Sequence, residues 1–185
     1  MKVLGLSGSL RSGSHNSRLL RAAAELLPPG TELVEFTELK SIPPYDEDDE
    51  AAGHEAVDAL RAAIADADAI LIATPEYNHS IPGVLKNAID WASRPTAEAA
   101  LKNKPVAVVG TSTGMFGAVW AQAETRKALA GAGARVIDRE LPVGSADEQF
   151  HPLDGRLVDE DLRIELGGIV HELVSEVQPA LQRPS

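Results

Sequence analysis

The sequence contains no cysteine. A disulfide framework, a thiolate nucleophile and a metal site built on cysteine are therefore excluded. No apolar run approaches the ~20 residues that a transmembrane helix needs, so we expect no membrane partner. The first five residues, MKVLG, are typical of a strand and show no signal-peptide pattern. The simplest expectation is a soluble, cytoplasmic protein.

Positive charge is also scarce. The chain has 17 lysines and arginines against 28 acidic residues, which gives a net charge of −11. Nucleic-acid binding needs clustered basic side chains, so we expect no nucleic-acid partner. The five histidines, at positions 15, 54, 79, 151 and 171, include no His-x-x-x-His pair. We therefore expect no metal site.

Apolar runs alternate with helical patterns along the whole chain. The pattern predicts strands at residues 3–6, 32–36, 68–73, 106–109 and 134–137, and helices at 17–27, 54–65, 84–92, 118–130 and 159–177. Strict alternation of strands and helices predicts an α/β fold, a doubly wound five-stranded parallel sheet with helices on both faces. We expect one domain over residues 1–185, with the amphipathic strand 32–36 at an edge.

The segment 73–83 joins the third predicted strand to a helix through an unusually specialised loop. Pro75 donates no backbone hydrogen bond and so ends a strand ladder. Asn78 tolerates left-handed backbone angles, and Gly83 permits almost any. Such a loop holds a fixed backbone shape at the carboxyl end of a strand, where open α/β sheets bind ligands. A plain strand-to-helix turn is the alternative.

The segment 7–17 follows the first predicted strand and opens a helix. It is rich in serine and glycine and holds one cation, Arg11. A helix N-terminus presents unpaired N–H groups and a positive dipole end. With the hydroxyls and the guanidinium, these groups predict an anion site, most simply a phosphate site. A capped helix after a flexible turn is the alternative reading.

Two familiar phosphate motifs do not fit this segment. Gly8 and Gly13 have the spacing of a nucleoside-triphosphate loop, but Ser14 and His15 stand where that loop needs lysine. The Gly-x-Gly-x-x-Gly fingerprint of dinucleotide-binding proteins is absent as well. A hydroxyl-rich loop without these motifs suits a terminal monophosphate better than a pyrophosphate.

A third segment, 110–117, again places hydroxyls and glycines after a strand, which would let a flat ligand approach the backbone. Its signal is weak alone and gains weight from position. Specialised loops follow the first, third and fourth strands, whereas the ends of the second and fifth look ordinary. In a sheet of order 2-1-3-4-5, strands one and three meet at the topological switch point, where flavodoxin binds FMN.

Three motifs carry a family resemblance: GSLRSGSHN (8–16), PEYNHSIPGVLKNAIDW (75–91) and GTSTG (110–114). They resemble the NAD(P)H-dependent FMN reductase family, which includes bacterial quinone, chromate and azo reductases of flavodoxin-like fold. The resemblance covers nearly the whole chain, and the second motif is the most specific. This chain departs from the family at Met115 and Phe116, where smaller residues are common.

The resemblance implies a noncovalent FMN. By the family pattern, the phosphate would be held by Ser9, Arg11, Ser14, Asn16 and Ser17. The isoalloxazine ring would be lined, largely through backbone groups, by Pro75, Glu76, Tyr77 and Asn78, and flanked on its other side by Ser112, Thr113 and Gly114. Family members are usually dimers or tetramers, so the resemblance also implies a homo-oligomer.

The function that follows is an oxidoreductase. NADH or NADPH would deliver hydride through FMN to a quinone, an azo compound, a metal oxyanion or free flavin. The cofactor carries the chemistry, so we assign no catalytic side chain. A non-enzymatic flavodoxin-type electron carrier is the alternative. A receiver domain of similar architecture is discounted, because Leu6-Ser7-Gly8 stands where it needs acidic residues.

Overall fold

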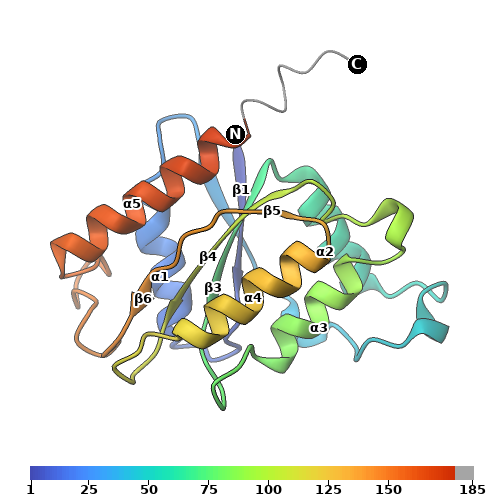
Figure 1. Cartoon of the computed structure of the whole chain (residues 1–185), viewed down its shortest axis with the longest axis horizontal. Helices are drawn as coiled ribbons and strands as arrows, with labels where there is room; N and C mark the ends of the chain where they lie inside the picture. Colours follow the sequence, from blue (N-terminus) through green and yellow to red (C-terminus); the bar gives the residue numbers. More distant parts are fainter. Residues whose placement is uncertain (178–185) are drawn as a thin grey trace.

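A parallel β-sheet forms the middle layer of the molecule (Figure 1). The computed structural model describes residues 1–177. The strands are β1 (Lys2–Ser7), β2 (Glu32–Phe36), β3 (Ala69–Thr74), β4 (Pro105–Thr111), β5 (Arg135–Val136) and β6 (Pro142–Val143). Their order is β2-β1-β3-β4-β5, every pairing is parallel, and β6 also pairs with β4. The predicted order and the edge position of β2 are confirmed.

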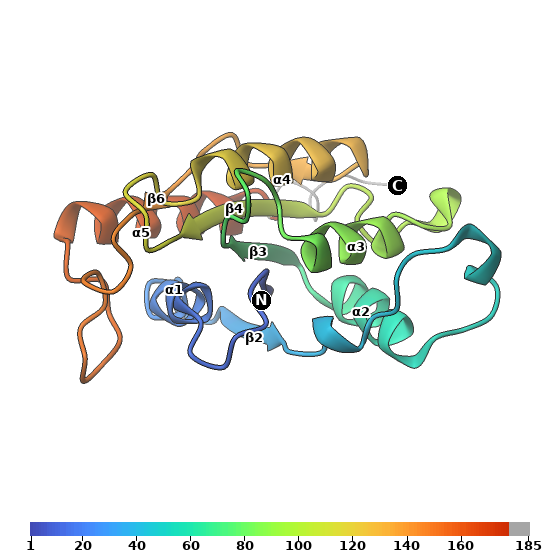
Figure 2. The same ribbon diagram turned by 90° about the horizontal axis from the view of Figure 1, so that it is seen from below.

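Helices cover both faces of this sheet (Figure 2). They are α1 (His15–Ala24), α2 (Glu55–Asp66), α3 (Gly83–Ala92), α4 (Val119–Gly131) and α5 (Glu160–Ser175), with short 3₁₀ turns η1 (Leu39–Ser41), η2 (Glu47–Asp49) and η3 (Thr96–Glu98). Within residues 1–177, no helix has the length and hydrophobicity needed to cross a membrane.

Each face of the sheet has its own hydrophobic core. On one face, Leu71 and Val109 pack with side chains of α1 and α5. On the other, Ile72 and Val108 pack with side chains of α2, α3 and α4. Successive residues of a strand point to opposite faces, and every residue of β3 and β4 is buried. The central strands are therefore apolar throughout, as the sequence predicts for residues 106–109.

The first helix begins two residues before its predicted start. Ser14 is its N-cap, and the Ser14 hydroxyl accepts a hydrogen bond from the Ser17 N–H at 3.3 Å. The structure therefore shows the capped helix of the alternative reading, with its cap at Ser14. The helix also ends at Ala24, three residues before the predicted end.

The fifth position of the sheet is filled by two short strands. β5 pairs with the start of β4, and β6 pairs with its end. The sequence predicted one strand here, at 134–137, and did not predict the strand at Pro142 and Val143. Two residues that begin with proline form no recognisable apolar run, which is why the sequence did not indicate β6.

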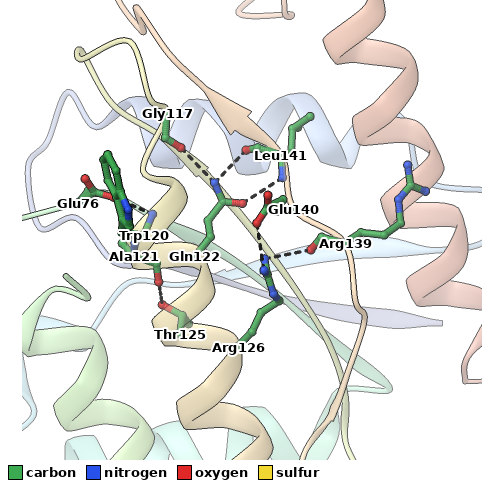
Figure 3. Close-up of polar contacts among 10 residues, drawn as sticks. All are labelled: Glu76, Gly117, Trp120, Ala121, Gln122, Thr125, Arg126, Arg139, Glu140 and Leu141. Carbon is green, nitrogen blue, oxygen red and sulfur yellow. Dashed lines mark hydrogen bonds and ion pairs between the residues drawn. The ribbon is translucent and has the colours of Figure 1, made fainter. Parts of the chain in front are cut away.

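A buried glutamine of α4 occupies the gap between β5 and β6 (Figure 3). The Leu141 N–H donates to Gln122 Oε1 at 3.0 Å, and Gln122 Nε2 donates to the carbonyls of Leu141 and Gly117 at 3.2 and 3.0 Å. Gln122 is fully buried. Its amide therefore replaces the sheet hydrogen bonds that the interrupted strand lacks.

We predict that Gln122→Leu destabilises the fold. The leucine keeps a similar size but leaves the Leu141 N–H and the Gly117 carbonyl without these partners. Unpaired buried polar groups cost about 1–3 kcal/mol each, so the free energy of unfolding should fall by about 2–4 kcal/mol. Urea denaturation followed by circular dichroism measures it.

The matched control is Ala130→Gln, at an exposed position of the same helix. It should change the free energy of unfolding by less than about 0.5 kcal/mol. If Gln122→Leu were as mild as this control, the amide would not be what supports the interrupted strand.

Candidate functional site

The loops that follow β1, β3 and β4 enclose a cavity of about 230 Å³. Strands β1 and β3 are neighbours, so the cavity lies at the topological switch point, where open α/β sheets bind ligands. Its lining residues are Ser9, Arg11, Ser14, His15, Asn16, Pro75, Glu76, Tyr77, Thr111, Ser112 and Thr113.

Most of the residues predicted for the site line this cavity. The predicted residues that line it are Ser9, Arg11, Ser14, Asn16, Pro75, Glu76, Tyr77, Ser112 and Thr113. Ser17, Asn78 and Gly114 are not part of its lining, and His15 and Thr111 line it without having been predicted. His15 follows the helix cap and Thr111 ends β4, so position was the only signal for either. Contact of any of these residues with a ligand stays a prediction.

The side chain of Asn16 ties α1 to the end of β4. Asn16 Nδ2 donates to the Thr111 carbonyl, and the Thr111 N–H donates to Asn16 Oδ1, both at 3.1 Å. Asn16 is 3% exposed. The structure thus shows Asn16 as a bridge between two cavity walls, while its predicted contact with a phosphate stays a prediction.

The phosphate end of the predicted site is rich in donors. Arg11 is exposed, and the one hydrogen bond of its guanidinium among the described residues goes to the Gly13 carbonyl. His15 Nε2 lies 3.0 Å from Asp147 Oδ1, whereas His15 Nδ1 is buried with no hydrogen-bond partner in residues 1–177. A helix N-terminus beside a guanidinium fits an anion.

The loop after β3 contains a tight hairpin turn. Tyr77 and Ser80 exchange two backbone hydrogen bonds, of 3.2 and 3.1 Å. Between them, Asn78 and His79 both have positive φ, 54° and 58°, as a type I′ turn requires. The left-handed angle of Asn78 agrees with the predicted tolerance, but that of His79 was missed. Gly83 simply begins α3 and has no positive φ.

Glu76 from this loop caps a helix that is distant in the sequence. Glu76 Oε2 accepts hydrogen bonds from the N–H groups of Trp120 and Ala121, both at 3.1 Å (Figure 3). The N-cap residue of α4, Ala118, offers no side-chain hydrogen bond of its own. The Glu76 side chain is therefore engaged with α4, which agrees with the expectation that this loop lines the cavity largely through its backbone.

A second carboxylate forms the reciprocal contact. Glu124 of α4 accepts hydrogen bonds from the Ser80 hydroxyl at 2.5 Å and from the Ile81 N–H at 3.3 Å. These two bonds, the hydroxyl's first, hold the pKa of Glu124 below its ordinary value of 4.5. The hydrogen bonds between this loop and α4 join residues 43 to 45 positions apart, so the local sequence carried no signal for them.

The loop after β4 rests on the segment that follows β6. The N–H groups of Ser145 and Ala146 donate to the carbonyls of Gly114 and Ser112 at 3.1 and 3.0 Å. A Cβ on Gly144 would lie 2.4 Å from the Met115 carbonyl oxygen, so this approach requires glycine. The expectation that the end of the fifth strand is ordinary is therefore wrong.

Met115 and Phe116 are two exposed side chains of the loop after β4. They are 77% and 58% exposed, and neither belongs to its lining. The Phe116 ring meets the edge of the Trp120 ring at a centroid distance of 5.1 Å. The two bulky residues that depart from the family pattern therefore extend an exposed aromatic surface beside the cavity.

Comparison with known proteins identifies the relatives of this chain. The profile of a family described as NADPH-dependent FMN reductase matches residues 1–148. An NAD(P)H-dependent FMN reductase of Pseudomonas aeruginosa is 45% identical over 184 residues, which is 98% of this chain and 94% of the relative. A 2-hydroxy-1,4-benzoquinone reductase of a Burkholderia species is 39% identical over 163 residues, 88% of each protein.

Among solved structures, the flavoenzyme NAD(P)H:(acceptor) oxidoreductase FerB of Paracoccus denitrificans superposes with a TM-score of 0.83. It is 36% identical, and the match covers 96% of this chain and 97% of FerB. All three of these proteins are named as reductases or oxidoreductases.

We predict that Asn16→Ala destabilises the protein even without any ligand. The substitution removes both bonds to the Thr111 backbone and leaves its N–H and carbonyl without these partners. The free energy of unfolding should fall by about 2–4 kcal/mol. Urea denaturation of flavin-free protein measures it.

Ser9→Ala is the control, because Ser9 lines the same cavity and its hydroxyl makes no hydrogen bond among residues 1–177. The free energy of unfolding of this control should stay within about 0.5 kcal/mol of that of the parent protein. Equal stability of Asn16→Ala and the parent would contradict the bridging role.

Proposed function

The chain belongs to the NADPH-dependent FMN reductase family, and we propose that it passes hydride equivalents from NADH or NADPH through a noncovalently bound FMN to small electron acceptors. Quinones, azo compounds, metal oxyanions and free flavin are the acceptor classes. Relatives named FMN reductase and quinone reductase support this activity. The observation that carries it is the cavity at the switch point, whose anion-binding end adjoins a slot between two specialised loops.

The proposal assigns the phosphate of FMN to the N-terminus of α1. Arg11 would supply a charged donor, and the hydroxyls of Ser9 and Ser14 would add neutral ones. The Arg11 guanidinium supports the fit, because it is exposed at the cavity and, among the described residues, makes a single hydrogen bond, to the Gly13 carbonyl. Asn16 and Ser17 complete the set through the first turn of the helix.

The isoalloxazine ring is assigned to the slot between residues 75–78 and residues 112–114. FMN bound there would supply the hydride and electron-transfer chemistry between the nicotinamide and the acceptor. The protein binds and orients the ring, and the backbone N–H groups of the two loops stabilise negative charge at its edge. No side chain is assigned as a proton donor.

A flavodoxin-type electron carrier is the competing function. Such carriers usually enclose the flavin between bulky aromatic side chains. Within the described residues, Tyr77 is the only phenylalanine, tyrosine or tryptophan that lines the cavity, and it is 52% exposed. One exposed tyrosine leaves the ring accessible to a nicotinamide, which favours the enzyme.

Anaerobic stopped-flow mixing of the FMN-loaded protein with each nicotinamide separates the two functions. The enzyme predicts rapid loss of the visible flavin absorbance with NADH, NADPH or both, and its return when a quinone is added. If the bound FMN stays oxidised with both nicotinamides, the protein is not a reductase of this kind.

The proposal also includes a cytoplasmic location, one domain over residues 1–185, and assembly as a homodimer or homotetramer. The last eight residues of that domain lie outside the described range. The exposed side chains of Met115, Phe116 and Trp120 support assembly, because soluble monomers seldom expose adjoining apolar groups. Light scattering on the purified protein tests the oligomeric state.

We predict that Arg11→Ala weakens FMN binding. A hydrogen bond to a charged group contributes about 1.5–3 kcal/mol, which corresponds to roughly a 10- to 100-fold rise in the dissociation constant. Quenching of flavin fluorescence on binding measures it. Arg18→Ala is the matched control, since Arg18 is exposed on α1 and does not line the cavity. Unchanged affinity in Arg11→Ala would remove this residue from the phosphate site.

A further inference from the structure

Two carboxylates join the loop after β3 to α4 from opposite directions. Glu76 of the loop accepts hydrogen bonds from the helix backbone, and Glu124 of the helix accepts hydrogen bonds from the loop. We infer that this pair, the carboxylate clamp, positions residues 75–78 as the wall against which the flavin ring packs. The inference rests on the proposed function and adds two positioning residues to it.

The first half of the clamp replaces a missing helix cap. Ala118 at the N-cap of α4 has a φ of 62° and no polar side chain. The first N–H groups of a helix need acceptors, and its positive dipole end favours a carboxylate. The Glu76 carboxylate accepts the hydrogen bonds of two of these N–H groups and places a negative charge at the dipole end. Only 11% of the Glu76 side chain is exposed. Its position is therefore determined by the helix.

The second half of the clamp holds the far side of the hairpin turn. The Ser80 hydroxyl and the Ile81 N–H both reach Glu124 Oε2. The turn between the two halves contains His79, a left-handed residue that is not glycine. Such a conformation persists when the surrounding contacts hold it. The clamp supplies these contacts, because Glu76 binds α4 before the turn and Glu124 binds Ser80 and Ile81 after it.

The His79 side chain closes the arrangement. His79 Nδ1 lies 3.5 Å from Glu76 Oε1, and the His79 ring meets the Trp120 ring edge to face at a centroid distance of 5.0 Å. The turn therefore packs on the same first turn of α4 that Glu76 caps.

The same helix also supports the opposite wall of the slot. The third loop leads directly into α4, and Gln122 binds the Gly117 carbonyl at its end (Figure 3). Residues 75–78 are thus held by α4 through Glu76, whereas the loop that contains residues 112–114 is held by α4 at Gly117. Loss of the clamp would free one wall to move relative to the other and change the width of the slot.

Flavin titration of a small set of variants tests the inference. Glu76→Ala removes both bonds to α4, and we expect FMN to bind about tenfold more weakly, as the loss of bonds to a charged group implies. The affinity for riboflavin should fall by the same factor, because the clamp positions the wall beside the ring and does not contact the phosphate. Glu124→Ala should also lower the affinity for both FMN and riboflavin.

Visible circular dichroism of the bound flavin should also change in Glu76→Ala, because the spectrum reports the asymmetry of the ring's surroundings. Glu76→Gln keeps a carbonyl that accepts both helix N–H bonds, so it should restore FMN affinity to within about threefold of the parent protein. Glu140→Ala is the matched control. Glu140 pairs with Arg126 of α4 at 3.0 Å and makes no contact with the loop.

The inference fails if folded Glu76→Ala binds FMN with the parent's affinity and gives an unchanged flavin spectrum. It fails equally if Glu76→Gln binds FMN as weakly as Glu76→Ala, since the hydrogen bonds to α4 would then not be the cause of the lost affinity. If the parent protein itself binds no FMN, it is the proposed function that fails.

Discussion

Burial of the central strands on both faces is the constraint on which the site depends. Every side chain of β3 and β4 is covered, and in both strands the first polar residue is the last one, Thr74 in β3 and Thr111 in β4. The strands are parallel, so their carboxyl ends lie at one edge of the sheet. The reversal of strand order between β1 and β3 then leaves a cavity between the loops at that edge.

Helix α4 connects the parts of this edge. Its buried Gln122 fills the gap in the interrupted fifth strand, its first turn is capped by Glu76, and its Glu124 holds the hairpin turn. The loop after β3 and the chain before β6, which are distant in the sequence, are thereby fixed relative to one element. A flat ring between two loops needs such a common reference, because preorganised backbone groups act only when their positions are set in advance.

The sequence predicted the parts of the structure that local patterns encode. Alternating apolar runs and helical patterns predicted the α/β fold, and the strand order 2-1-3-4-5 came from the flavodoxin-like arrangement. The first and third specialised loops were visible as clusters of hydroxyls and glycines. What it did not predict depends on tertiary contacts. Strand β6 is too short to show a hydrophobic periodicity. Position 144 requires glycine only because the Met115 backbone lies beside it, and the bridge from Asn16 to Thr111 joins residues 95 positions apart. Glu76 likewise gained its role only once α4 was placed.

The most direct test of the account is a crystal structure of the protein with FMN. The account predicts the phosphate at the first turn of α1 within hydrogen-bond distance of Arg11, and the ring between residues 75–78 and 112–114. A phosphate bound elsewhere would contradict it. The larger cavity of about 400 Å³ between α3 and α4, where Lys86, Arg94 and Lys102 gather, is the alternative place to look.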